Sequence, residues 1–289
     1  MTGALVVVRA GALTTVQDEG RTGWAHLGVG RAGALDAPAH RLANRLVGNP
    51  VSAAVLETTV TGCAVRPSRS VVAVVGGAVC RVTVDGRPVA WGAPVRVPAG
   101  AVLEAGPAVS GLRGYLGFAG GLVPDAVLGS RSADLLSGLG PAPLRDGDVL
   151  PLGRPVSGAP AADTVPWAGA PTELVLPVHL GPRHTWFTDT ALRTLATASY
   201  RVSAHSNRIG LRTEGPPLQR ARDGELPSEG MVLGAIQVPP DGRPVVFLND
   251  HPTTGGYPVV GVVPERALAA AAQAVPGVGV RFVFSPSGG

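Results

Sequence analysis

The sequence contains no lysine, since all 24 of its basic residues are arginine. Without lysine the chain has no P-loop, whose lysine contacts phosphate, and no side chain that could form a Schiff base. The Ser-Ser-Lys centre of amidases is excluded for the same reason, and so is a biotin attachment site, which also needs a lysine. These exclusions hold even if the depletion reflects only a mutational bias toward arginine codons.

Charge of either sign is also scarce. Charged residues make up 15% of the chain, and the net charge is +4. The arginines are scattered and no basic run is interleaved with aromatic residues, so we expect no nucleic-acid partner. The six histidines form no pair at metal-ligand spacing, and no metal site is predicted. Cys63 and Cys80 lie in or beside apolar runs, where we expect buried thiols, with a disulfide as the alternative.

Long apolar runs are missing as well. The longest, residues 71–80, contains two glycines and is too short to span a bilayer. The N-terminus has no basic region ahead of its short apolar stretch, so it does not resemble a signal peptide. We therefore expect a soluble, cytoplasmic protein with no membrane partner.

What the chain does contain is hydrophobic residues, at 45%, together with 41 glycines and 28 prolines. Valine-rich runs broken by glycine or proline recur along it, and valine favours the pleated surface of a strand. The sequence therefore predicts a mainly β protein with the strand spacing of a sandwich or barrel. We expect strands at residues 5–9, 71–75, 79–84, 95–97, 102–104, 174–178, 231–238, 245–248, 259–263 and 278–284, and turns at Gly76-Gly77, Asp85-Gly86, Pro98-Ala99-Gly100 and Asp241-Gly242.

Three short helices are predicted. Asp36 can cap the first turn of a helix in which Pro38 takes an early position and which ends at Gly48. A second helix is expected from Asp189 to about residue 196, and a third after Pro264, through the alanines to residue 274.

The length and composition favour two domains. Residues 153–171 are rich in alanine, proline and glycine and are the best candidate for a linker between domains at 1–152 and 172–289. The pentapeptide Asp-Gly-Arg-Pro-Val occurs at residues 85–89 and again at 241–245. The repetition is either the coincidence of a common hairpin turn or a sign of two related barrel halves.

Four polar segments carry the candidate chemistry, at residues 15–23, 203–212, 227–230 and 249–258. Arg208 and Arg212 offer guanidinium forks that match an anion, and residues 253–256 offer hydroxyls and backbone amides that could cradle one. Taken singly, each segment also fits a structural role as a loop, strand edge or tight turn. A match to G-x-G-x-x-G at residues 28–33 follows no strong strand, so a dinucleotide site is not favoured.

Together, these segments and others resemble one known family. Its motifs occur in family order as TVQDEGRTGWAHLGVGRAGALDAPAHRLANRLVGN, VLETTVTG, RGYLGFAGGL, LGSRSADL, VSAHSNRIGLRTEG, PSEGMVLGAIQVPPDGRPVVFLND and TTGGYPVV, and they cover nearly the whole chain. The chain resembles the carboxyltransferase A/B-subdomain family, also called allophanate hydrolase subunit 2, which includes the C subunit of 5-oxoprolinase and the KipI antagonist. The resemblance implies a fold of two cyclophilin-like β-barrel domains with a few short helices.

The resemblance also implies a reaction and partners. We expect a component of a cytoplasmic ATP-dependent 5-oxoprolinase, which opens 5-oxo-L-proline to L-glutamate. Its partners would be the B subunit of 5-oxoprolinase, which is allophanate hydrolase subunit 1-like, and in some systems a LamB/YcsF-like A subunit. Two alternatives stay open. One is a biotin-dependent carboxyltransferase acting on a urea-like or amide substrate, with biotin on another chain or domain. The other is a non-catalytic module that antagonises a kinase inhibitor.

The expected site residues lie mostly in the second half of the chain. Glu229, Asp250 and Arg212 are the catalytic candidates, the carboxylates as general bases or hydrogen-bonding groups and the arginine as an anion clamp. Candidates for substrate or anion binding are Arg208, Gln237, Thr253, Thr254, Gly255, Gly256 and Tyr257, and the secondary candidates are Gln17, Asp18 and Arg21. Three positions depart from the family pattern, namely Asn207, Pro252 and Ala133. These departures bear on the substrate rather than the fold.

Overall fold

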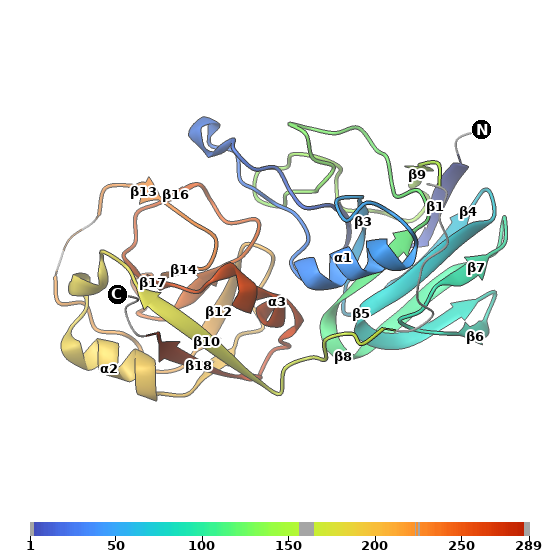
Figure 1. Ribbon diagram of the computed structural model, residues 1–289. Helices are drawn as coiled ribbons and strands as arrows, with labels where there is room; N and C mark the ends of the chain where they lie inside the picture. Colours follow the sequence, from blue (N-terminus) through green and yellow to red (C-terminus); the bar gives the residue numbers. More distant parts are fainter. Residues whose placement is uncertain (1–2, 156–164, 223, 225, 286–289) are drawn as a thin grey trace. The chain divides into compact units, whose positions relative to one another are not determined.

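The structure is a computed structural model that describes residues 3–155, 165–222, 224 and 226–285. It is mainly β with three short α-helices in its described residues, which confirms the predicted fold class (Figure 1). The chain divides into two compact units. The N-terminal unit comprises Met1–Arg21, Ala32–Asp134 and Gly138–Ala170, and the C-terminal unit comprises Thr22–Arg31, Leu135–Ser137 and Pro171–Gly289.

The N-terminal unit is built on a nine-stranded antiparallel sheet. Six strands follow the order β2-β3-β8-β4-β1-β9, while β5 pairs with β6, β7 and β8. The strands are β1 (Gly3–Arg9), β2 (Thr14–Gln17), β3 (Val55–Thr59), β4 (Cys63–Pro67), β5 (Val71–Val84), β6 (Arg87–Val89), β7 (Val95–Val97), β8 (Leu103–Phe118) and β9 (Val149–Leu152).

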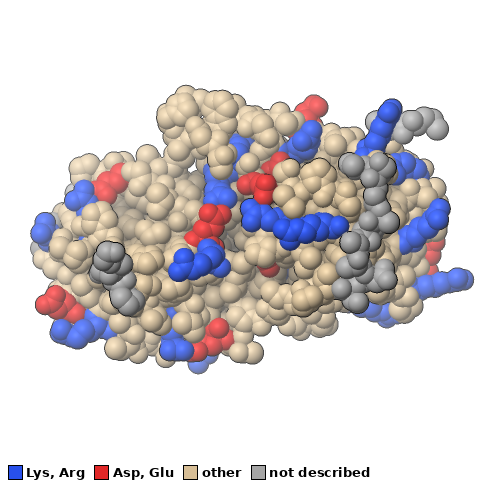
Figure 2. Space-filling view, in the orientation of Figure 1, with Lys and Arg blue, Asp and Glu red and all other residues tan. Residues whose placement is uncertain are grey.

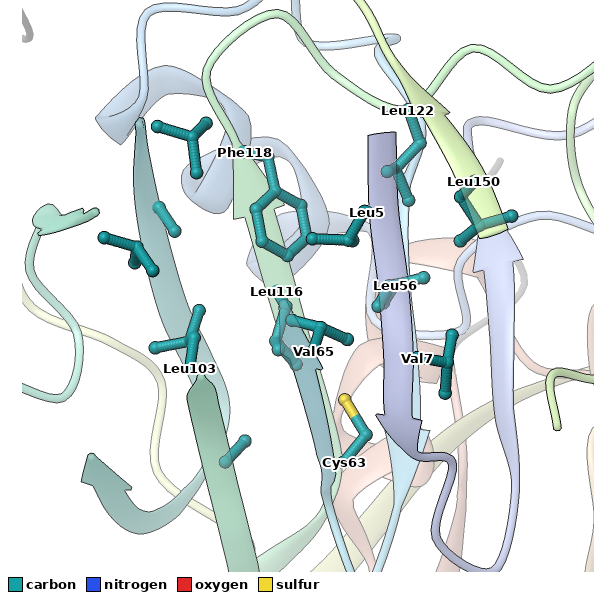
Figure 3. Packing of buried hydrophobic residues seen from close by; sticks show 14 of the residues in the cluster. Leu5, Val7, Leu56, Cys63, Val65, Leu103, Leu116, Phe118, Leu122 and Leu150 are labelled. Atoms are coloured by element: carbon teal, nitrogen blue, oxygen red, sulfur yellow. The ribbon is translucent and has the colours of Figure 1, made fainter. Parts of the chain in front are cut away.

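The larger hydrophobic cluster of this unit lies on one face of the sheet. Alternate residues of the strands point to it, as the two-residue period of a strand requires, and Figure 3 shows Leu5, Leu56 and Phe118 among them. Cys63 is buried in the same core, and burial raises the pKa of its thiol to about 12. Cys80 is only half-buried and also free, so the two cysteines do not form a disulfide.

Helix α1 (Ala37–Leu46) begins where the sequence predicts. The Asp36 carboxylate accepts a hydrogen bond from the Ala39 amide at 3.0 Å, and Pro38 lies in the first turn. Its buried face packs on Val74 and Tyr115. The N-terminal cap, the early proline and the apolar face together determine where this helix begins and which side of it is buried.

One predicted turn is wrong. Gly76 and Gly77 lie inside β5, which runs without reversal and is paired along its length with β8. The pairing shifts register after Gly77, which takes φ 78°, and a Cβ there would lie 2.5 Å from the Arg113 carbonyl oxygen. The glycine therefore allows a bulge rather than a turn, so the two predicted strands are one.

The C-terminal unit is a closed seven-stranded barrel in the order β10-β17-β14-β15-β12-β11-β18. Its interior is filled by residues such as Leu176, Ile236, Val246 and Phe282, all fully buried. The barrel strands are β10 (Glu173–Leu180), β11 (Tyr200–Val202), β12 (Gly210–Glu214), β14 (Ala235–Gln237), β15 (Val245–Phe247), β17 (Val259–Val262) and β18 (Gly279–Phe284). The strands β13 (Glu229–Gly230) and β16 (Thr254–Gly255) form a separate two-stranded sheet.

The predicted helices of the second half are confirmed as α2 (Asp189–Thr197) and α3 (Glu265–Gln273). Short 3-10 helices η1 (Ala25–Leu27) and η2 (His184–Trp186) complete the elements of the described chain. No helix in the described residues is both long and apolar enough to cross a membrane. On the face that Figure 2 draws, arginines and acidic residues are scattered among uncharged ones, as the low charge content predicts.

The two copies of Asp-Gly-Arg-Pro-Val take different settings. Asp85 and Gly86 form a two-residue hairpin between β5 and β6, with φ 47° and 76°. Asp241 and Gly242 instead lie in the longer connection between β14 and β15. Of the predicted linker, residues 156–164 lie outside the described residues, while Trp167 beyond them belongs to the N-terminal unit and donates from Nε1 to the Gly92 carbonyl oxygen at 2.9 Å.

Candidate functional site

The register of the barrel places two predicted site residues on one outer face. Arg212 of β12 lies opposite Val245 of β15, which lies opposite Gln237 of β14. Directly opposed residues point to the same side of a sheet. Because their neighbours Leu211 and Ile236 fill the barrel interior, Arg212 and Gln237 share the outside.

This outer face is hollowed beside Arg212 into a groove of about 550 Å³, which we call the arginine groove. Its polar lining includes Ser203, His205, Arg212, Glu214, Asp241 and Arg243. The volume is within the range of small-molecule sites, roughly 300–1,000 Å³.

The charges of the arginine groove are arranged unevenly. The Glu214 carboxylate accepts a hydrogen bond from the Ser203 hydroxyl at 2.7 Å, and the Asp241 carboxylate accepts one from the Arg243 amide at 3.1 Å. The guanidinium groups of Arg212 and Arg243 have no acceptor within the part of the chain that the structure describes. The groove therefore offers two exposed cationic forks to an incoming anion.

Arg208 and Asp250 form a buried ion pair instead of an open site. The Arg208 Nε donates to Asp250 Oδ2 at 2.9 Å and its Nη2 donates to Oδ1 at 2.8 Å, while both side chains are 0% exposed. The Leu135 amide also donates to Asp250 Oδ2, at 3.1 Å. Both carboxylate oxygens are thus occupied and out of reach of solvent, which favours positioning over proton transfer for Asp250.

Most of the other predicted site residues lie in or beside the small β13–β16 sheet. Glu229 lies opposite Gly255, and its carboxylate accepts a hydrogen bond from Arg183 Nε at 2.7 Å. The Met231 amide donates to the Thr253 carbonyl oxygen at 2.8 Å. Thr254 is exposed, and Gly256 follows the sheet half-buried.

Gln237 connects this small sheet to the barrel face. Its Nε2 donates to the Tyr257 carbonyl oxygen at 3.4 Å, and a Cβ on Gly255 would lie 2.7 Å from that same nitrogen. A side chain at position 255 would therefore displace the end of the Gln237 side chain from this contact. Gln237 links the row that contains Arg212 to the loop that contains Thr254 and Tyr257.

The secondary candidates form their own buried cluster in the N-terminal unit. Asp18 Oδ1 accepts hydrogen bonds from the Ser130 and Ser132 hydroxyls, each at 2.6 Å, and from the Gly20 amide at 2.8 Å. Asp18 Oδ2 accepts one from the Arg131 amide at 2.6 Å. Burial raises the pKa of the Asp18 carboxyl, but these donors outweigh it, so the pKa lies below its ordinary value.

Arg21 and Gln17 belong to the same cluster. Arg21 is 2% exposed and donates to the Ser132 carbonyl oxygen, and Gln17 donates to the Ala133 carbonyl oxygen at 3.0 Å. These contacts hold the segment that follows Ser130. A role in organising this loop fits the three secondary residues better than direct contact with a substrate.

Sequence reasoning missed part of the groove. In the sequence Asp241 and Arg243 stand out only as part of a repeated turn, and His205 and Glu214 are not singled out. Glu214 could have been found, because it follows Arg212 by two residues and so lies on the same side of a strand. Asp241 and Arg243 could not, because only the pairing of β12 with β15 brings their loop to Arg212.

Comparisons with known proteins all point to one family. The family model for the carboxyltransferase domain, subdomain A and B, matches residues 27–284. The C subunit of 5-oxoprolinase from Escherichia coli strain K12 is 36% identical over 285 residues, which cover 96% of this chain and 90% of that protein.

Two further relatives are much longer proteins. The urea amidolyase of Saccharomyces cerevisiae is 34% identical over 305 residues, which cover 97% of this chain but 16% of that protein. The solved structure of K. lactis urea amidolyase superposes with a TM-score of 0.89 at 31% identity, covering 98% of this chain and 19% of that one.

Proposed function

The chain belongs to the carboxyltransferase-domain family, subdomains A and B, and from that membership we propose that it is the C subunit of an ATP-dependent 5-oxoprolinase. In this proposal it acts in the cytoplasm, in a complex with the B subunit of that enzyme, and opens 5-oxo-L-proline to L-glutamate. A LamB/YcsF-like A subunit is the expected third component.

The observation that carries this proposal is the length of the match. The likeness to the C subunit of the E. coli 5-oxoprolinase extends over 90% of that protein, so the two chains correspond nearly end to end. The urea amidolyases contain the same domain as a small fraction of a larger chain. The match therefore covers most of a 5-oxoprolinase C subunit but only a small part of a urea amidolyase, and this favours the C subunit as the guide to function.

The arginine groove supports the binding of a small carboxylate. The lactam carries one carboxylate, for which the exposed Arg212 fork is a suitable partner. Gln237, the Thr254 hydroxyl and the amides of Gly255 and Gly256 lie along the same side of the barrel or in the adjoining loop and would orient the amide. In the same proposal the Glu229 carboxylate, which Arg183 holds in place, and the Tyr257 side chain complete the polar surround.

The chain's residues do not fit a familiar nucleotide site. It has no lysine and therefore no P-loop. The residues that line the groove do not belong to a glycine-rich turn that leads into a helix. A lactam is a stable amide whose opening needs activation, and ATP is the co-substrate in the proposed reaction. We therefore assign ATP to a site that needs the partner protein, and expect the isolated chain to be inactive.

Carboxyl transfer from biotin is the second candidate, because the urea amidolyase relatives align over nearly the whole of this chain. With no lysine here, the biotin must arrive on another domain or protein. Adding a biotinylated carrier protein separates the two proposals, since only carboxyl transfer depends on it.

Co-expression with the B and A subunits, followed by an assay of 5-oxoproline-dependent ATP hydrolysis, tests the proposal. Activity should appear in the complex and not with the purified chain alone. Full ring opening by the chain alone would refute the assignment of ATP to the complex.

An arginine-to-lysine exchange tests the site within that complex. Arg212→Lys keeps the charge but loses the planar fork, so turnover should fall by roughly a hundredfold. Arg193→Lys, on the exposed surface of α2, is the matched control and should retain turnover. Wild-type turnover in Arg212→Lys would remove Arg212 from the site.

A further inference from the structure

The arginine groove contains two guanidinium groups, and the proposed substrate has only one carboxylate. Arg212 lies opposite Val245 on the outer face of the barrel, and Arg243, in the connection just before β15, lines the same groove. Both side chains are exposed and line the groove without an acceptor among the described residues. The second fork therefore suggests a ligand with a second acidic group.

The groove also contains two carboxylates. Glu214 uses one oxygen to accept from Ser203, and Asp241 uses one to accept from the Arg243 amide. An ionised carboxylate has about four acceptor positions on its two oxygens, so each can still receive a donor. These carboxylates disfavour a ligand that is only anionic and favour one that also carries an ammonium group.

Ring opening gives the proposed substrate a second carboxylate and an ammonium group, which are the groups that the groove favours. Hydrolysis adds one water across the lactam C–N bond, so the carbonyl carbon gains hydroxyl and the nitrogen gains hydrogen. At neutral pH the lactam has one carboxylate and an uncharged amide, whereas the opened product has two carboxylates and one ammonium. The net charge stays the same, but the number of charged groups rises from one to three.

We propose that the arginine groove binds the opened α-amino dicarboxylate, L-glutamate, more tightly than it binds the lactam. Arg212 takes one carboxylate, Arg243 takes the other, and Glu214 or Asp241 receives the ammonium. This inference rests on the proposed function and extends it, since it makes the groove a site at which accumulated product inhibits the enzyme. Arg243 is the residue that distinguishes product from substrate.

Calorimetry on the full purified chain tests the ligand class without any variant. L-glutamate should bind more tightly than 5-oxo-L-proline. Glutarate, which lacks the ammonium, and 4-aminobutyrate, which lacks the α-carboxylate, should each bind about tenfold or more weakly than L-glutamate, as expected for a lost charge-assisted contact. Equal affinity for glutamate and glutarate, tighter binding of the lactam, or no binding of any of them would overturn the inference.

Substitution of Arg243 then tests its role. Arg243→Gln should weaken L-glutamate binding about tenfold or more and change lactam binding by less than about threefold, because only the opened form has the second carboxylate. Arg212→Gln should weaken both ligands, and Arg193→Gln neither. Equal losses of both ligands in Arg243→Gln would show that this residue does not discriminate.

The inference and the proposed function fail in different ways. In an active complex, L-glutamate should inhibit ring opening competitively, and Arg243→Gln should relieve that inhibition. If the complex opens 5-oxoproline but glutamate neither binds nor inhibits, the inference is wrong and the function stands. If the chain binds glutamate and no complex opens the lactam, the function is wrong and the amino-acid site remains.

Discussion

The two units of this protein each bury an aspartate, and they satisfy it by opposite means. In the N-terminal unit, Asp18 accepts hydrogen bonds from two serine hydroxyls and two backbone amides. In the C-terminal unit, Asp250 faces the guanidinium of Arg208 in a bidentate pair that is 0% exposed. Neutral donors hold a loop in shape, whereas the ion pair joins the residues that precede β12 to those that follow β15.

Each unit also buries a tyrosine, and the two tyrosine hydroxyls differ in their hydrogen bonding. The Tyr115 hydroxyl donates to Glu57 Oε2 and accepts from the Asp36 amide, both at 2.8 Å. The Tyr200 hydroxyl is equally buried but has no partner among the described residues. Buried polar groups therefore contribute unequally to the two units, and substitution can measure how unequally.

Removing one member of the buried ion pair should have the largest effect. Asp250→Ala leaves the Arg208 charge buried without its carboxylate, which typically destabilises a fold by about 3–5 kcal/mol. Urea unfolding of the purified chain would measure it. The double substitution Arg208→Met with Asp250→Leu should recover most of that loss, because no charge is left buried.

A loss below about 1 kcal/mol in Asp250→Ala would contradict the pair's structural role. The double variant separates stability from catalysis. If it regains stability but the proposed 5-oxoprolinase complex stays inactive, the pair also positions the candidate site.

Asp18→Asn should cause the second-largest loss of stability, and this loss should depend on pH. An asparagine amide cannot accept from donors on both sides, so we expect a loss of about 2–3 kcal/mol at neutral pH. The pKa of Asp18 is lowered in the folded state, so its contribution is present above about pH 4 and is lost as pH falls through the folded-state pKa. The wild type and the variant should therefore converge in stability in acid.

Urea unfolding at neutral, mildly acidic and strongly acidic pH would follow this convergence. Asp125→Asn changes an exposed carboxyl and is the matched control. A difference between wild type and Asp18→Asn that does not change with pH would show that the Asp18 charge contributes nothing.

Local signals in the sequence predict much of the fold. Asp36 and Pro38 locate α1, and valine-rich runs locate most of the barrel strands. The Gly76-Gly77 pair misleads, because the same glycine freedom serves a turn or a bulge, and only the partner strand β8 decides between them. The local sequence pattern therefore predicts the presence of a helix or strand more reliably than it predicts where that element ends.

The candidate site shows the same division. Arg212 is predicted from its residue type and is exposed on the groove. Residue type also predicts Arg208 as an anion binder and Asp250 as a base. In the structure these two residues, 42 positions apart in the sequence, instead form a buried ion pair with each other. Burial depends on tertiary pairing, which neither residue reveals in its own neighbourhood.

Tyr115→Phe should have a smaller effect than either aspartate substitution. Removing the hydroxyl leaves the Asp36 amide without its acceptor and Glu57 without one donor, so we expect a loss of about 1–2 kcal/mol. The Leu35 amide still donates to the same Glu57 oxygen at 2.9 Å, which limits the loss. Thermal unfolding should detect it, and an unchanged midpoint would mean that water replaces the hydroxyl.

Tyr200→Phe should have the smallest effect and the opposite sign. Burial raises the pKa of the Tyr200 hydroxyl to about 12, and that hydroxyl has no partner within the described chain to offset its desolvation. The ring itself packs edge-on to Phe282, with centroids 5.5 Å apart, and phenylalanine keeps that contact. We therefore expect no loss, or a gain of up to about 1 kcal/mol, measured beside Tyr115→Phe under the same conditions. A loss as large as that of Tyr115→Phe would reveal a hydrogen-bond partner for Tyr200 and remove the contrast between the two cores.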